Sequence, residues 1–193
     1  MLRRSPKINM HMRISALCVS LLGLIVLGGC ATQNASSRPN DYSTPPPPYR
    51  SDFHYGPNPA TVDVFSAASP QTAPPLTVYV WLMGIRQAEP HSPIPPSVEV
   101  RMKFDNHGTR PVSFDPSSLE LETGELRPLP SPILNPAIPF EVPPGSNHEL
   151  AAYFPFPPGT SSQTLDLTHF RVRWRVQIDS QPITQTAYFD RIP

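Results

Sequence analysis

The chain has 193 residues, including 29 prolines, two cysteines, and 15 basic against 15 acidic residues. Four of the basic residues and none of the acidic ones precede residue 30, so the remainder carries 11 against 15, a formal net charge of −4. This mildly acidic composition argues against a nucleic-acid partner, which requires a clustered basic surface.

Residues 1–29 have the layout of a secretory signal peptide. An apolar stretch over residues 14–29 follows a basic segment, whose basic residues are Arg3, Arg4, Lys7 and Arg13. A membrane-spanning helix needs about 20 apolar residues, so this stretch is short for one. An uncleaved N-terminal membrane anchor is the alternative to a cleaved signal.

The residues that end the apolar stretch are Leu27, Gly28, Gly29 and Cys30, and they resemble the lipobox of bacterial lipoproteins. The resemblance implies cleavage before Cys30, lipidation of its thiol, and stable anchoring by two or more acyl chains. Ala31 is similar to the residue found after the lipidated cysteine in outer-membrane lipoproteins of Gram-negative bacteria. We therefore expect a cell-envelope protein, on the outer membrane facing the periplasm if the cell is Gram-negative.

The two cysteines leave no thiol for other chemistry, because Cys18 departs with the signal and Cys30 is acylated. No catalytic or metal-binding motif is present, and the five histidines after residue 30 are widely separated, at His54, His91, His107, His148 and His169. We expect no metal, no cofactor and no enzymatic activity.

Residues 30–75 are predicted to be the lipidated cysteine and a proline-rich linker, disordered and solvated, because proline fixes φ and cannot donate to a β-ladder. Residues 46–49 match the PPxY peptide that WW domains bind. A stiff spacer ending in Tyr49 is the alternative that we favour for an exported chain. Residues 61–65 are a candidate short strand.

The folded part is predicted to begin at residue 76, with strands recognised by alternation of apolar and polar residues. Residues 76–86 are apolar on both faces of a strand. Residues 97–105 place one set of side chains inward and another toward solvent, the latter being Glu99, Arg101, Lys103 and Asp105. A final hairpin is predicted to close across residues 179–182, with Ser180 and Gln181 as the two central turn residues.

About seven short strands separated by turn signals predict an all-β fold, an immunoglobulin-like β-sandwich over residues 76–193. We expect twelve side chains in its core: Val78, Val80, Val98, Val100, Met102, Phe104, Leu119, Leu121, Phe154, Val172, Trp174 and Val176.

The runs VEVRMKFDNHGTRPVSFDPSSLELETGE and VPPGSNHELAAYFPF resemble the immunoglobulin-like accessory domains of bacterial lipoproteins. In such domains a strand ends in Asn-x-Gly, Pro-Val and a Leu-x-Leu strand follow, and a Pro-Gly turn precedes a strand that ends in phenylalanine. Most of these domains have no established activity, so the resemblance implies a fold and no catalytic position. The prolines over residues 128–139 depart from the pattern and indicate an irregular connection.

The candidate binding face is a row of three arginines, Arg171, Arg173 and Arg175, on the outer side of the strand RVRWRV. A purely structural role is the alternative that we favour, with cross-strand partners at Asp190, Tyr188 and Thr186 and ion pairs to Glu99 and Asp105.

Together these features predict a membrane-anchored envelope lipoprotein whose sandwich is a non-catalytic interaction or structural module, with an envelope protein or glycan as partner. A hydrolase or ligand-binding lipoprotein with a loop-built site is the alternative.

Overall fold

The computed structural model describes residues 49–50, 52–66 and 74–193. The predicted signal peptide, Cys30 and the predicted linker as far as Pro48 lie outside the described residues. Within the described ranges, no helix combines the length and apolar character needed to cross a bilayer.

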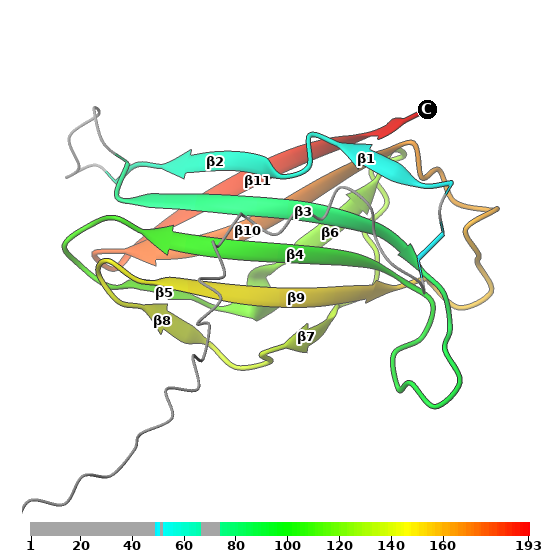
Figure 1. The fold of residues 1–193 in the computed structure, drawn as a ribbon, viewed down its shortest axis with the longest axis horizontal. Coiled ribbons are helices and arrows are strands. Elements are labelled where there is room, and N and C mark those ends of the chain that lie inside the picture. The colour runs from blue at the N-terminus through cyan, green and yellow to red at the C-terminus, as the bar shows by residue number, and fades with distance from the viewer. Residues whose placement is uncertain (1–48, 51, 67–73) are drawn as a thin grey trace, which may run out of the picture. The chain divides into compact units, whose positions relative to one another are not determined.

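The described residues form two packed antiparallel sheets (Figure 1). The first sheet has the order β2 (Ala60–Val64), β3 (Leu76–Arg86), β4 (Ser97–Asn106), β9 (Asn147–Pro155) and β7 (Ile133–Asn135). The second has the order β1 (His54–Gly56), β11 (Gln181–Ile192), β10 (His169–Ile178), β5 (Val112–Phe114) and β8 (Phe140–Val142). A further strand, β6 (Glu120–Thr123), follows a 3₁₀ turn, η1 (Pro116–Ser118), and pairs with β10 beyond β5.

The strand order is that of an immunoglobulin-like sandwich. In the constant-type fold, strands ABED form one sheet and CFG the other. Here β3-β4-β9-β7 take the places of ABED, while β5 with β6, β10 and β11 take those of CFG. The described residues hold eleven strands against the predicted seven, because one strand is interrupted by η1 and β1, β2 and β8 are additional.

The predicted core is confirmed, since all twelve side chains lie buried between the sheets. Strand β10 shows the reason most clearly: Phe170, Val172, Trp174 and Val176 alternate with outward residues and are each at most 2% exposed. Period-two alternation in an antiparallel strand with one buried face fixes this arrangement.

One predicted surface residue is instead buried. Glu99 of β4 points away from the core, yet its side chain is 1% exposed. Its neighbour on β3 is Gly84, which has no side chain and stands at an irregularity in the β3–β4 register. Gly84 has φ of +98°, and a Cβ there would lie 3.0 Å from the carbonyl oxygen of Phe53. A stretch of chain upstream therefore covers this part of the outer face.

The predicted domain start at residue 76 is wrong, because a segment of the expected linker belongs to the sandwich. We call Tyr49, Arg50 and residues 52–66 the N-terminal strap. Its strand β1 pairs with β11 of the second sheet, and β2 pairs with β3 of the first. The strand expected over residues 61–65 is confirmed as β2. Prolines 57 and 59 fall between the two strands, where no ladder donor is needed.

The hairpin between β10 and β11 closes one residue earlier than predicted. Ile178 pairs with Gln181, and the two turn residues, Asp179 and Ser180, have φ of 53° and 62°. Positive φ at both central positions is typical of the type I′ turn that suits hairpin twist. An ion pair of 2.6 Å between Arg110 Nη1 and Asp179 Oδ1 reaches the turn from outside the hairpin. Because the turn lies one residue earlier than predicted, the partner of each β10 residue on β11 is shifted by two positions from the predicted one.

Candidate functional site

The arginine row lies on the outer face of the second sheet, as the alternation predicted. The corrected hairpin register puts Tyr188 beside Arg171, Thr186 beside Arg173 and Thr184 beside Arg175. On its other side, β10 is flanked by β6 and β5. The row is thus bordered by uncharged residues on one side and by acidic ones on the other.

Two of the three arginines are engaged by glutamates of β6. Arg171 Nε donates to Glu122 Oε2 at 2.6 Å, and Arg173 Nη1 lies 3.6 Å from Glu120 Oε2. Both pairs join cross-strand neighbours in the β10–β6 ladder. The hydrogen bond that Arg171 donates to Glu122 raises the pKa of Arg171 above its ordinary value. The expected partners Glu99 and Asp105 are wrong, because both belong to β4 in the first sheet.

Arg175 differs from its two neighbours. It lies beyond the last β6 pairing, and its exposed guanidinium has no ion pair or hydrogen bond among the described residues. Its backbone is held instead, since Ser118 Oγ of η1 lies 3.3 Å from both its amide nitrogen and its carbonyl oxygen. The backbone position of Arg175 is fixed while its side-chain donors are available.

Two adjoining hollows meet at Arg175. The larger, of about 490 Å³, is lined by Ser113, Phe114, Asp115, Ser118, Pro139, Phe140, Glu141, Arg175 and Gln177. We call it the outer groove. The smaller, of about 280 Å³, shares Asp115, Ser118 and Arg175 and extends toward Glu120 and Thr184.

The groove forms because a small side chain stands between longer ones. Ser113 of β5 is the cross-strand neighbour of Gln177 on one side and of Glu141 on the other. One end is closed by η1, where Asp115 caps the turn by accepting from the Ser117 amide at 2.9 Å. Residues 117 and 118 are thus turn residues, and the interruption of the strand by η1 opens space beside Arg175.

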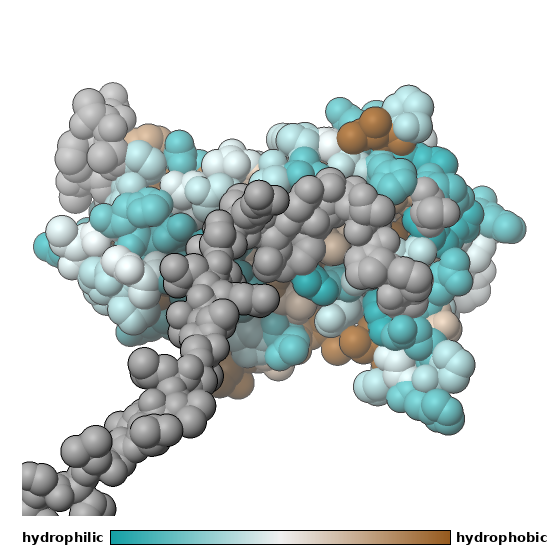
Figure 2. All heavy atoms as spheres, viewed as in Figure 1, coloured by the Kyte–Doolittle hydropathy of each residue, from teal (hydrophilic) through white to brown (hydrophobic). Residues whose placement is uncertain are grey.

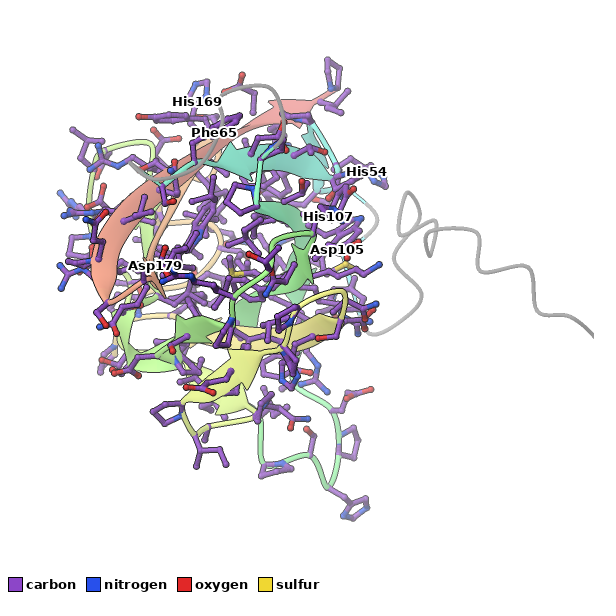
Figure 3. All side chains as sticks on the ribbon, turned by 90° about the vertical axis from the view of Figure 1, so that its left-hand side faces the viewer. His54, Phe65, Asp105, His107, His169 and Asp179 are labelled. Carbon is purple, nitrogen blue, oxygen red and sulfur yellow. The ribbon has the colours of Figure 1, made fainter. Side chains whose placement is uncertain are left out.

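The histidines form no common centre. Among the residues with described positions, no group of three or more His, Cys, Asp or Glu side chains is arranged to hold a metal ion. His169 contacts Asp190, with 2.6 Å between Nδ1 and Oδ1, and lies apart from His54 and His107 (Figure 3). Next to His107, buried Asn106 donates to the carbonyl oxygens of Arg110 and Val142, each at 2.8 Å, which gives this segment a turn-fixing role.

A second polar cluster was missed from the sequence. Buried Glu99 accepts hydrogen bonds from the Tyr49 hydroxyl and from Arg101 Nε, the latter at 2.6 Å. Burial and the hydrogen bond to Glu99 raise the pKa of Tyr49 well above its ordinary value. Burial, followed by the charge of Glu99, also raises the pKa of Tyr153 on β9. The sequence signal was a tyrosine at the end of a proline run, which alone does not identify its partner.

The same strap is held at two further points. Phe53 has the guanidinium of Arg50 at 4.6 Å and that of Arg191 on β11 at 4.3 Å from its ring centroid. Arg50 Nη1 also donates to Ser162 Oγ at 2.8 Å, and Arg191 Nη2 donates to the carbonyl oxygen of Asp52 at 2.8 Å. The strap is therefore part of the folded unit and touches both sheets.

Apart from these features the surface is mainly polar, as Figure 2 shows for one face. Among the described residues, the large hydrophobic side chains that remain exposed are scattered over the strap, loops and strands: Phe65, Leu126, Ile133, Ile138, Tyr188 and Ile192. Single exposed apolar residues are ordinary on protein surfaces.

No family model matches the sequence, and no curated protein matches it. Among solved structures, the yjhA protein from Bacillus subtilis is similar with a TM-score of 0.32 and 10% identity, over 50% of this chain and 71% of that chain. A TM-score this low does not define a shared fold.

Proposed function

We propose that the mature chain is a membrane-anchored envelope lipoprotein whose β-sandwich is a non-catalytic interaction module. The anchor is supported by the sequence Leu27-Gly28-Gly29-Cys30 after a complete signal-like segment. The interaction role is supported by one observation above the others: Arg175 is the unengaged member of an otherwise paired arginine row, and it stands where two hollows meet.

The outer face of the second sheet suits recognition because its charges are held in place. Arg171 and Arg173 are engaged by Glu122 and Glu120, which limits their freedom before any partner arrives. A pre-ordered surface loses less side-chain entropy on binding than a mobile one. Arg175 then offers its planar set of donors to a partner.

The strap limits how far this face stands from the membrane. If the lipid is on Cys30 and the chain folds from Tyr49 onward, a polyproline II tether between them would extend about 60 Å at about 3.1 Å per residue. A tether running to residue 75 would have reached about 140 Å at the same rise. The proposed partner therefore lies close to the membrane that carries the anchor.

The anchor is tested by metabolic labelling with palmitate. The wild-type chain should incorporate label and be processed, and Cys30→Ser should do neither. Labelling of Cys30→Ser at the wild-type level would contradict lipidation at this residue.

The interaction role is tested by crosslinking in intact envelopes with the full lipoprotein as bait. Arg175→Glu should lose the captured partner. Arg127→Glu is the matched control, because it makes the same charge change at a side chain that is 69% exposed and pairs locally with Glu125. Equal capture by both variants would contradict an interaction role for the Arg175 face.

A further inference from the structure

We propose that residues 42–48 of this chain dock on the outer face of the first sheet, with Tyr42 against Trp81. In this sheet β3, β4 and β9 lie side by side (Figure 1). The face belongs to the sheet opposite the arginine row, so the proposal goes beyond the interaction role and does not depend on it. It also accounts for a strand, β3, whose sequence is apolar on both faces.

The first observation is the burial of an outward-facing tryptophan. Trp81 points away from the core-facing residues of β3, yet it is only 6% exposed. Its neighbours border it from the sides: Tyr79 stacks at 6.1 Å between ring centroids, and Arg101 is its cross-strand partner on β4. On the outer face of the second sheet, Tyr188 also has an arginine as its cross-strand partner and is 65% exposed. Neighbours within the sheet therefore do not bury an outward aromatic ring by themselves.

After Tyr49, the described part of the strap contacts the edge of β3. The side-chain amide of Asn58 donates to the carbonyl oxygen of Leu82 at 3.2 Å, and β2 then continues along the same edge. Contacts with the backbone at an edge do not extend across the outer face to the indole of Trp81. The cover of this ring is therefore assigned to chain upstream of the strap.

The chain enters this outer face at Tyr49. The Tyr49 hydroxyl donates to Glu99, and Arg101 Nε donates to the same carboxylate at 2.6 Å. Arg101 is in turn the cross-strand neighbour of Trp81. Alternate residues of a strand are about 7 Å apart, so the Tyr49 hydroxyl is fixed one such step from the row that contains the indole. The residues before Tyr49 are thus delivered to this face.

Reach and composition select residues 42–48 as the occupant. Tyr49 forms a bridge with the last residue of β3, and Trp81 lies five residues earlier on that strand, about 17 Å away at about 3.3 Å per residue. A polyproline II chain spans about 22 Å between Tyr49 and Tyr42, which is enough to reach the indole. Tyr42 is the one aromatic residue of the predicted linker upstream of Tyr49, and four prolines follow it. Proline-rich segments dock on aromatic-lined surfaces because their extended conformation is preformed.

A hollow beside Trp81 fits a side chain of such a segment. It lies over Ala151 of β9, whose small side chain stands between Arg101 on β4 and Asn135 on β7. Its volume is about 180 Å³, whereas small-ligand sites run from about 300 to 1,000 Å³. The size therefore favours a single side chain delivered by the chain itself over a separate small molecule.

Docking has two consequences for the molecule. The outer face of the first sheet is closed to partners, which leaves the arginine-row face for recognition. If the lipid is on Cys30, the polyproline II reach of the remaining tether to Tyr42 is about 37 Å.

The burial of Trp81 is tested by acrylamide quenching of tryptophan fluorescence in the detergent-solubilised, full mature lipoprotein. The chain has two tryptophans and Trp174 is fully buried, so a change in quenching reports on Trp81. We expect weak quenching in the wild type and several-fold stronger quenching when Tyr42→Ser, Pro46→Ser and Pro47→Ser are combined. Adding Trp81→Phe should remove the increase.

The matched control combines Gln33→Ser, Asn34→Ser and Ala35→Ser, which changes the same number of residues farther upstream in the predicted linker. Its quenching should equal that of the wild type. Strong quenching in the wild type would overturn the proposal. Wild-type quenching in the variant altered at residues 42, 46 and 47, with a native circular-dichroism spectrum, would overturn it as well.

The occupant is identified by placing a photoreactive phenylalanine derivative at position 42. We expect a crosslink within one chain, mapped by mass spectrometry to β3 or β4. A crosslinked dimer would assign the face to a second copy of the chain, and a crosslink to a different protein would assign residue 42 to a partner. Either result, or the lack of any crosslink within the chain, would overturn docking in cis. None of these outcomes alters the separate crosslinking test of Arg175→Glu.

Discussion

The hydroxyl of Tyr49 donates to the buried carboxylate of Glu99, a residue that lies 50 positions farther along the chain. This contact joins the residue that follows the proline run to the first part of β4. It ties the first described residue to the first sheet, and it explains why an outward-facing glutamate is almost inaccessible to solvent.

Removing the Tyr49 hydroxyl should destabilise the sandwich. Tyr49→Phe leaves Glu99 buried with one fewer donor, which we expect to cost about 1–3 kcal/mol of unfolding free energy. Tyr188→Phe is the control, because its side chain is 65% exposed and its loss should cost less than about 1 kcal/mol. Thermal or urea unfolding measures both, and equal stability of the two variants would contradict the role assigned to the strap.

Stability should also fall at alkaline pH. Burial raises the pKa of Tyr49 and of Tyr55 in the folded chain above the ordinary value near 10. Below pH 10 both states keep these protons, but above it the unfolded chain releases them first, so the free energy of unfolding decreases as pH rises. Tyr49→Phe should flatten this decrease in urea titrations between about pH 9 and pH 11. A slope identical to that of the wild type would show that Tyr49 contributes nothing to it.

Trp174 offers a direct test of the face assignment of β10. Its side chain is fully buried, so Trp174→Ala should cost about 3–5 kcal/mol. Its indole Nε1 has no hydrogen-bond partner among the described residues. Trp174→Phe should therefore cost clearly less than Trp174→Ala, because no hydrogen bond is lost. Urea midpoints would show this order, and an unchanged midpoint for Trp174→Ala would place the residue at the surface.

Much of the sandwich could be predicted because alternation is a local signal. The spacing of Val98 and Val100 is enough to assign both to the inner face of β4, and both are buried. Glu99 between them could not be placed correctly, since its burial depends on Tyr49, which is distant in sequence. Local spacing tells which way a side chain points and says nothing about what covers it.

The predictions of the domain start and of the hairpin register were wrong for related reasons. Prolines dominate the composition around β1 and β2, yet they stand between the strands and leave their ladders intact. The partners of the arginine row depend on which two residues adopt positive φ, and Asp179 with Ser180 was not the expected pair. The row itself was predicted from alternation, whereas the groove beside Arg175 depends on η1 and on β8, which alternation does not position.

The two engaged arginines should differ from Arg175 in their contribution to stability. A double-mutant cycle on Arg171 and Glu122 should give a coupling free energy of at most about 1 kcal/mol, because both side chains retain contact with solvent. Arg175→Ala should leave stability within about 0.5 kcal/mol of the wild type. A loss above that value for Arg175→Ala would indicate a structural role for this residue as well.

The measurement that tests the interaction role most directly is site-specific photocrosslinking in intact cells. A photoreactive phenylalanine derivative would replace Gln177 at the outer groove, with Lys103 on the outer face of the first sheet as the control position. Benzophenone chemistry captures both proteins and glycans, so the result does not depend on the class of partner. We predict an adduct from position 177 that disappears when Arg175→Glu is added, and none from position 103. An adduct from position 103 alone, or one from position 177 that survives Arg175→Glu, would contradict recognition through this face.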